Sequence, residues 1–245
     1  MTLSDTERLS KKMNTSQPPI ANRAYGHPTK TNQLNPPMAN LSTDHHKATR
    51  HLARNDRVLK QLIRAVGPCT LNFNADHFSV LAQSIISQQI SGKAAKAIAA
   101  RLLKTLPRSG LTATGLLRLS DDQMRAAGLS ANKARSLRDL AEKVKSREVP
   151  LRRLHQMDDE DVIAHLIPVR GIGRWTAEMF LIFSLGRLDV LPVDDFGLRT
   201  GVRDVYFLRD LPDKKSLLAR AEPWRPYRSI ATWYFWRSRG FVPQS

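Results

Sequence analysis

The chain of 245 residues is long enough for one or two domains with a sizeable buried core, and no apolar run approaches the roughly 18 residues that span a bilayer. A single cysteine, Cys69, excludes an internal disulfide framework and any all-cysteine zinc or iron–sulfur site. The 39 Lys and Arg against 22 Asp and Glu give a net charge of +17, which favours nucleic acid as a partner over a membrane, the alternative being a basic surface that only aids solubility.

Residues 1–46 are predicted to form a disordered N-terminal tail. The segment is rich in Asn, Pro, Thr and Ser, and its scattered apolar residues follow no period. Such a composition cannot bury enough surface to offset the entropy of ordering. Most of the excess positive charge therefore belongs to the folded part, residues 47–242.

The folded part has a helical pattern almost throughout and no segment that alternates as a strand. Gly67-Pro68 ends the first apolar face, which contains Leu59, Leu62, Ile63 and Val66. Two helices follow, broken near Ser91, and further helices are expected to begin after Ser120, with a capping-box pattern, and after Ser130. We expect an all-α domain of about nine to eleven helices.

Residues 166–183 read as a helix, a short turn and a second helix, with the turn "PVRGIG" at 168–173. Gly171 and Gly173 leave the backbone amides uncovered, and the second helix directs its free N–H groups and positive dipole end toward the turn. Arg170 and Arg174 add positive charge. The turn suits a phosphate, although a tight turn between packed helices without a ligand is the alternative.

The stretch "LIPVRGIGRWTAEMFLIFSLGRLDVLPVDD", residues 166–195, closely resembles the helix–hairpin–helix (HhH-GPD) DNA glycosylase superfamily. Residues 84–91, 128–141 and 224–237 agree with its AlkA-type 3-methyladenine DNA glycosylase II branch. The resemblance covers 47–242 and implies two helical lobes flanking a cleft, with the hairpin at 158–185. The β-rich N-terminal domain of the bacterial prototype is missing, so the chain resembles a compact form of the branch.

The resemblance implies that Asp195, the second residue of an aspartate doublet, is catalytic. Cleavage of an N-glycosidic bond places positive charge on the sugar, which a fixed carboxylate stabilises. It could also orient or deprotonate the attacking water. An N-cap is the ordinary role of Asp at a helix start, and both roles can coexist. Asp194 is assigned to helix capping or support.

Three aromatic residues, Trp175, Phe196 and Trp236, match the base pocket of this branch. Relatives that also cut the strand have a lysine at the position of Trp175, so its absence implies a monofunctional enzyme. Electron-rich rings attract a cationic alkylated base by about 0.5–2 kcal/mol. Core packing is the alternative for each ring.

A base in duplex DNA must be flipped out before it is cut, and a side chain should fill the gap. Gln89, in "SQQIS", is at the position where the family places this intercalating residue; the AlkA prototype has a leucine there. The alternative is that Gln88 and Gln89 cap or bridge helices.

These observations predict a monofunctional DNA glycosylase of base excision repair that hydrolytically excises alkylated purines of the 3-methyladenine and 7-methylguanine type. Double-stranded DNA is the expected partner of a monomer inside the cell, in the cytoplasm or nucleoid of a bacterium or in a nucleus. We expect no cofactor and no side-chain metal site, although the carbonyls of residues 169–173 could hold a monovalent cation. The alternatives are a non-catalytic helix–hairpin–helix DNA-binding module and a helix-turn-helix regulator.

Overall fold

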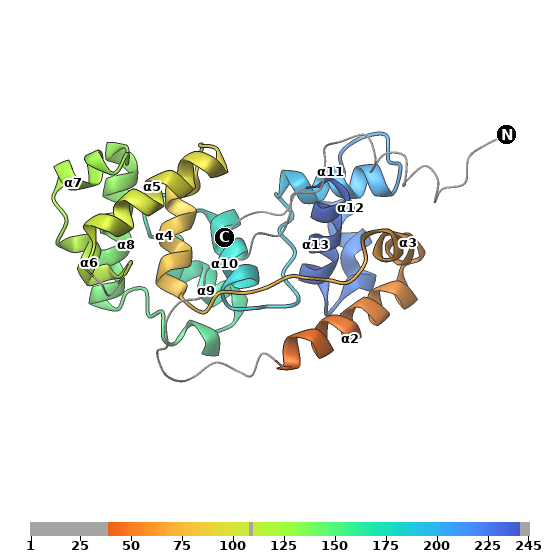
Figure 1. Cartoon of the computed structure of the whole chain (residues 1–245). Coiled ribbons are helices and arrows are strands. Elements are labelled where there is room, and N and C mark those ends of the chain that lie inside the picture. Colours follow the sequence, from red (N-terminus) through yellow and green to blue (C-terminus); the bar gives the residue numbers. More distant parts are fainter. Residues whose placement is uncertain (1–38, 108–109, 241–245) are drawn as a thin grey trace. The chain divides into compact units, whose positions relative to one another are not determined.

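The computed structural model describes residues 39–107 and 110–240 (Figure 1). Within these ranges the regular secondary structure is helical, with twelve α-helices, two short 3₁₀ helices and no strand. The predicted all-α class is therefore confirmed. The helices outnumber the about nine to eleven expected, in part because α6, Ala113–Leu117, is too short to show a helical period.

The described helices form two compact units, and the first is built from two separate parts of the chain. Its members are α2 (Ala39–Asn55), α3 (Arg57–Val66), α11 (Phe196–Val205), α12 (Lys214–Ala221), η2 (Glu222–Trp224) and α13 (Arg228–Ser238). In Figure 1 these are the orange-brown and the blue helices.

The second unit runs without interruption from Asn72 to Pro192 within the described residues. Besides α6, it contains α4 (His77–Ser87), α5 (Gly92–Thr105), α7 (Asp121–Ala126), α8 (Ala131–Ser146), η1 (Leu154–Gln156), α9 (Asp159–Leu166) and α10 (Arg174–Phe183). No helix of the described residues in either unit is both long and apolar enough to cross a membrane.

Helix α2 begins at Ala39, before the predicted start of the folded domain at residue 47. The side chains of His45, Ala48 and Leu52 are buried at a spacing of three and four residues. The sequence predicts a helical pattern only from residue 47, so the N-terminal part of α2 falls within the predicted tail. Residues 1–38 of the predicted tail lie outside the described residues.

Three predicted helix starts are confirmed. Ser91 caps α5 by accepting a hydrogen bond from the Ala94 amide. Ser120 and Gln123 form a reciprocal capping box at α7, and Ser130 caps α8. Each serine oxygen satisfies an amide that has no partner within its helix, which is why these residues specify where the helices begin.

Helix α10 is a buried helix of the second unit. Its residues 176–183 are all buried, and the helix packs against α4 and α9. Helix α8 in turn packs against α4 and α6. The hairpin and the loop that follows α4 are therefore both attached to one helical core.

The core of the first unit is built on α13, in which residues 229–236 are all buried. Helix α11 packs directly on α13 because Gly201 has no side chain. A Cβ atom at residue 201 would lie 2.7 Å from the carbonyl oxygen of Phe235, closer than real Cβ atoms approach backbone. This close approach brings the start of α11 next to the end of α13.

Asp56 connects the two chain segments of the first unit. Its Oδ1 accepts hydrogen bonds from the amides of Val58 and Leu59 at 2.9 and 3.0 Å and so caps α3. Its Oδ2 accepts from the Trp224 indole N–H at 2.9 Å and from the Tyr206 hydroxyl. Burial, followed by the adjacent carboxylate, raises the pKa of Tyr206 well above its ordinary value, so this hydroxyl remains a donor.

We expect Asp56→Ala to lower the free energy of unfolding by about 3 kcal/mol, because the helix loses its N-cap and two largely buried donors lose their acceptor. Urea denaturation of the purified protein measures the change. Asp122→Ala is the matched control, since Asp122 also lies at a helix start but is 88% exposed, and its loss should stay within about 0.5 kcal/mol. Equal stability of the two variants would contradict the assigned role of Asp56.

Candidate active site

Asp195 is a buried carboxylate at the N-terminus of α11, with 5% of its surface exposed. Its Oδ1 accepts hydrogen bonds from the Leu198 amide at 2.5 Å and from the Trp236 indole N–H at 2.8 Å. One bond comes from the helix backbone and the other from α13, so the carboxylate is fixed from two sides. The N-cap role expected of Asp at a helix start is present.

Asp194 lies in a different environment from its neighbour. Its side chain is 51% exposed and its Oδ2 is 2.8 Å from Nζ of Lys214. The capping role considered for Asp194 was wrong, because Asp195 is the N-cap of α11. The doublet thus consists of one buried carboxylate and one carboxylate in a surface ion pair.

Trp236 is fully buried, and its indole N–H donates to Asp195. Gly197 leaves room for this contact, since a Cβ there would lie 3.2 Å from both Oδ1 of Asp195 and Cδ1 of Trp236. The ring therefore packs beside the carboxylate, and it is not at the surface. This burial agrees with core packing, the alternative that the sequence left open.

The other two predicted pocket aromatics are exposed. Phe196 directly follows Asp195 and is 69% exposed. Trp175 lies in the first turn of α10, in the second unit, and is 42% exposed. Both rings therefore lie at the surface of their units.

The hairpin consists of α9, a turn and α10, as the sequence predicted. Gly171 has a φ of +82°, and a Cβ there would lie 3.0 Å from the Ser136 hydroxyl. Gly173 is the N-cap of α10, with a φ of −97° that any residue adopts. A Cβ at residue 173 would meet no atom within 4 Å. Because this N-cap is a glycine, it makes no side-chain hydrogen bond to the first turn of α10.

The two arginines of the turn differ in their contacts. Arg170 is exposed, and its backbone amide donates to Oδ2 of Asp139 at 2.7 Å. The Arg174 guanidinium donates to both carboxylate oxygens of Glu160, at 3.0 and 2.5 Å, and to Glu178 at 3.2 Å. These bonds lower the pKa of Glu160 and raise that of Arg174. The predicted phosphate contact of the Arg174 side chain would require this ion pair to open.

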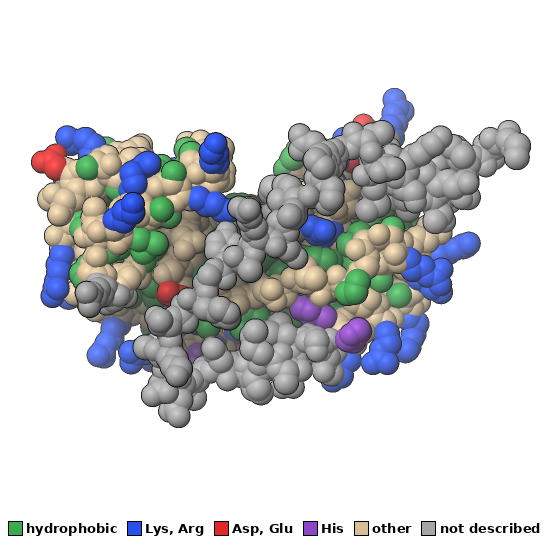
Figure 2. Space-filling view, viewed as in Figure 1, with side chains coloured by type: hydrophobic (Ala, Val, Ile, Leu, Met, Phe, Trp, Pro, Cys, Tyr) green, Lys and Arg blue, Asp and Glu red, His purple; other side chains and the backbone are tan. Residues whose placement is uncertain are grey.

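Lys and Arg side chains are scattered over the visible face of the described residues, with few Asp and Glu among them (Figure 2). A broadly basic surface of this kind attracts a polyanion without defining where it binds. The net charge therefore does not locate the binding site, whereas the backbone geometry of the hairpin turn indicates where an anion could bind.

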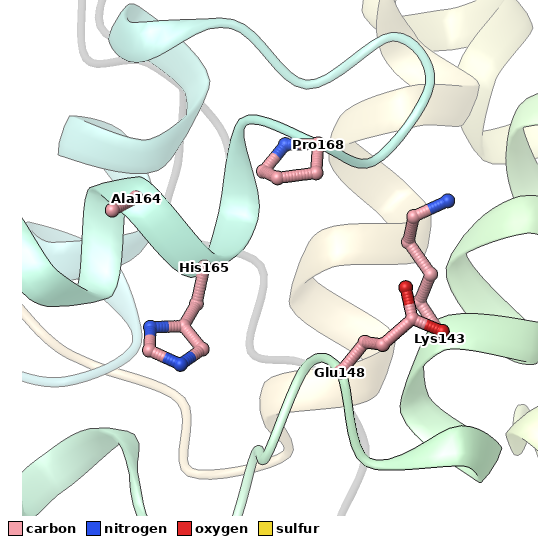
Figure 3. A pocket seen from close by; sticks show the side chains of 5 residues that line it. All are labelled: Lys143, Glu148, Ala164, His165 and Pro168. Atoms are coloured by element: carbon pink, nitrogen blue, oxygen red, sulfur yellow. The ribbon is translucent and has the colours of Figure 1, made fainter.

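A hollow of about 310 Å³, not predicted from the sequence, lies beside the hairpin in the second unit. Its wall contains Lys143, Glu148, Ala164, His165 and Pro168 (Figure 3). Lys143 already pairs with Asp139 at 2.5 Å. None of the predicted pocket aromatics lines the hollow, so it is distinct from the predicted base pocket.

Sequence reasoning missed two contacts of the hairpin turn, those of Asp139 and Gln88. Gln88 bridges to the turn by donating from Nε2 to the Gly171 carbonyl oxygen at 2.7 Å, which supports the bridging alternative for this residue. Gln89 is exposed and has a φ of +58°.

Among the described residues no cluster of His, Cys, Asp and Glu could hold a metal ion, and the monovalent cation at the turn carbonyls stays a prediction.

Most of the chain is similar in sequence to known proteins. Residues 82–226 match the family model described as HhH-GPD superfamily base excision DNA repair protein. The chain is 36% identical to DNA-3-methyladenine glycosylase 1 of Schizosaccharomyces pombe over 198 residues, 78% of this chain and 86% of the relative. It is 28% identical to the Alkylbase DNA glycosidase-like protein mag2 of the same yeast, over 80% of this chain and 94% of the relative.

Solved structures give the same result. The S. pombe 3-methyladenine DNA glycosylase Mag1, in complex with abasic DNA, matches with a TM-score of 0.70 and 34% identity, over 81% of this chain and 99% of that one. A DNA-3-methyladenine glycosidase of Bacillus halodurans matches with a TM-score of 0.73 and 37% identity, over 81% and 91%. The chain therefore belongs to the HhH-GPD superfamily of base excision DNA repair proteins.

Proposed function

We propose that the protein is a monofunctional DNA glycosylase that hydrolytically excises alkylated purines of the 3-methyladenine and 7-methylguanine type from double-stranded DNA. The observation that carries this proposal is the buried Asp195 carboxylate, fixed by a helix N-terminus and by Trp236. Relatives named 3-methyladenine DNA glycosylases support the substrate class. A non-catalytic DNA-binding module, or a helix-turn-helix regulator, would need this carboxylate only as the N-cap of α11. The expectation of a monomer stays a prediction.

Asp195 supplies the negative charge that the reaction needs. The sugar becomes positively charged as the N-glycosidic bond breaks, and a carboxylate already oriented by hydrogen bonds stabilises that charge without reorganising. Burial strengthens the effect, because water screens the charges less than it does at the surface. The same group can orient or deprotonate the attacking water.

The exposed rings of Trp175 and Phe196 are the proposed contacts of the flipped base. A purine alkylated at N3 or N7 is cationic and is attracted to the face of an aromatic ring. Trp236 takes a different role in this proposal, because its buried indole N–H orients Asp195. Residue 175 is tryptophan, so no amine is available there to form a Schiff base with the sugar.

The hairpin turn is the proposed site of a DNA phosphate. Gly173 leaves the N-terminus of α10 uncovered, and the positive end of the helix dipole favours an anion there. The exposed Arg170 adds charge beside the turn. Contacts of this kind fix the register of the protein on DNA without reading its sequence.

Asp195→Asn should retain the fold and the affinity for DNA but lose excision of 3-methyladenine by about 10²–10³-fold, because the amide keeps an oxygen acceptor but not the charge. Single-turnover release of free base from methylated duplex DNA measures the rate. The loss should be smaller for 7-methylguanine, whose cationic base already leaves readily.

Asp194→Asn is the matched control for Asp195→Asn, since it removes the neighbouring carboxylate from a surface ion pair and should leave the rate within a few-fold. The opposite result, with Asp194 essential and Asp195 silent, would overturn the assignment within the doublet. If the wild-type protein binds damaged DNA and releases no base, the non-catalytic module becomes the better explanation.

Gly173→Ala should weaken binding to duplex DNA of any sequence roughly tenfold, since a lost amide–phosphate bond is worth about 1–1.5 kcal/mol. The melting temperature should not fall, because the added Cβ meets no atom and the backbone conformation is ordinary. Gly171→Ala is the contrast: its positive φ and the nearby Ser136 hydroxyl predict a loss of stability as well. Unchanged DNA affinity of Gly173→Ala would refute phosphate binding at the turn.

Trp175→Ala and Phe196→Ala should each slow excision of 3-methyladenine roughly tenfold, the loss expected for one cation–π contact. Both side chains are exposed, so thermal stability should change little. Phe207→Ala is the matched control, because Phe207 is 47% exposed and lies in the same unit as Phe196. If Trp175→Ala or Phe196→Ala slows excision no more than Phe207→Ala does, the ring that was removed does not contact the base.

A further inference from the structure

The loop after α4 and the turn of the hairpin are joined by one side chain. Gln88 is the first residue of the plug loop, residues 88–91, and its Nε2 donates to the carbonyl oxygen of Gly171 at 2.7 Å. The two residues are 83 positions apart in the sequence. The bond therefore connects the segment of the predicted intercalating residue to the segment of the predicted phosphate site.

Helix α8 contacts both the end of α4 and the hairpin turn. Lys133 donates from Nζ to the carbonyl oxygen of Ile86, at the end of α4, at 2.6 Å. Asp139 accepts a hydrogen bond from the Arg170 amide of the turn at 2.7 Å. Helix α8 thus contacts both α4, which leads into the plug loop, and the turn, whereas Gln88 bonds the loop to the turn directly.

Gln89 has a backbone conformation that depends on its surroundings. Its φ of +58° lies in the left-handed region, which residues other than glycine adopt only when neighbouring contacts impose it. The hydrogen bond of Gln88, the preceding residue, is such a contact. Gln89 itself is exposed, so a packed core does not hold its side chain.

We propose that Gln88 is a positioning residue that fixes Gln89 relative to the phosphate-binding turn, an inference that rests on the proposed base excision. A side chain that fills the gap of a flipped base must enter the duplex at a set distance from the phosphates that the protein holds. The bond from Gln88 to Gly171 sets this distance. Without this bond, Gln89 is no longer held at the distance from the turn at which it can fill the gap while the turn binds a phosphate.

The test compares Gln88→Leu, which keeps the volume of the side chain but has no donor, with Gln83→Leu, which changes an exposed glutamine of α4. The probe is a duplex that contains an abasic-site analogue, and the reference is the same strand without its complement. Gln88→Leu should bind the duplex about tenfold more weakly, as loss of one hydrogen bond predicts, and the single strand within twofold of wild type. Gln83→Leu should match wild type on both.

A double-variant cycle distinguishes positioning from a contact of its own with DNA. If Gln88 acts through Gln89, then Gln88→Leu should cost less than about twofold in the background of Gln89→Ala, because the effects of coupled residues do not add. Additive losses would overturn the proposal, as would wild-type affinity of Gln88→Leu or equal losses on duplex and single strand.

Gln88→Glu provides a second variant of nearly the same shape in case Gln88→Leu does not fold. Its carboxylate has no proton to donate to the Gly171 carbonyl, so it should lose at least as much duplex affinity as the leucine variant. Wild-type duplex affinity of a folded Gln88→Glu would overturn the proposal. Binding of an abasic analogue requires no bond cleavage, so a wild-type protein that binds this probe but releases no base would refute the proposed function alone.

Discussion

The hydrogen bonds to Oδ1 of Asp195 are the interaction on which the rest of the proposed site depends. A charge is expensive to bury unless donors replace the lost water, and here a helix N-terminus and an indole N–H supply them. The indole donor requires α11 and α13 to lie close together, which the absence of a side chain at Gly201 permits. The same contacts that let the carboxylate be buried also orient it for chemistry.

The two glycines of the hairpin turn have different roles, although they belong to one sequence motif. Gly171 is required by the fold, through its positive φ and its approach to Ser136, whereas nothing in the protein itself requires glycine at residue 173. Arg174 likewise belongs to the structure, because it links α9 to α10 through Glu160. The positive charge available to a phosphate is therefore smaller than the number of arginines in the turn indicates.

The sequence predicted the features that are encoded locally, namely the all-α class, the helix break near Ser91, the capping box at Ser120, the helix start at Ser130, and the helices of the hairpin. It could not predict contacts between residues far apart in the chain. For Trp236 the sequence left core packing open as an alternative, but it did not show that the indole meets a carboxylate 41 positions earlier. For the same reason the sequence could not show that Gln88 meets Gly171. The family resemblance identified the doublet, while only the structure separated its members by burial.

The divided first unit has a consequence for how the protein folds. Asp56 must meet Tyr206 and Trp224, which are separated from it by 150 and 168 positions. On a ribosome the second unit emerges before α11 to α13 emerge, and it can fold while α2 and α3 still lack most of their core. The carboxylate of Asp195 is then among the last groups to become buried. Assembly of the first unit depends on contacts distant in sequence, which form slowly because a long loop must close first.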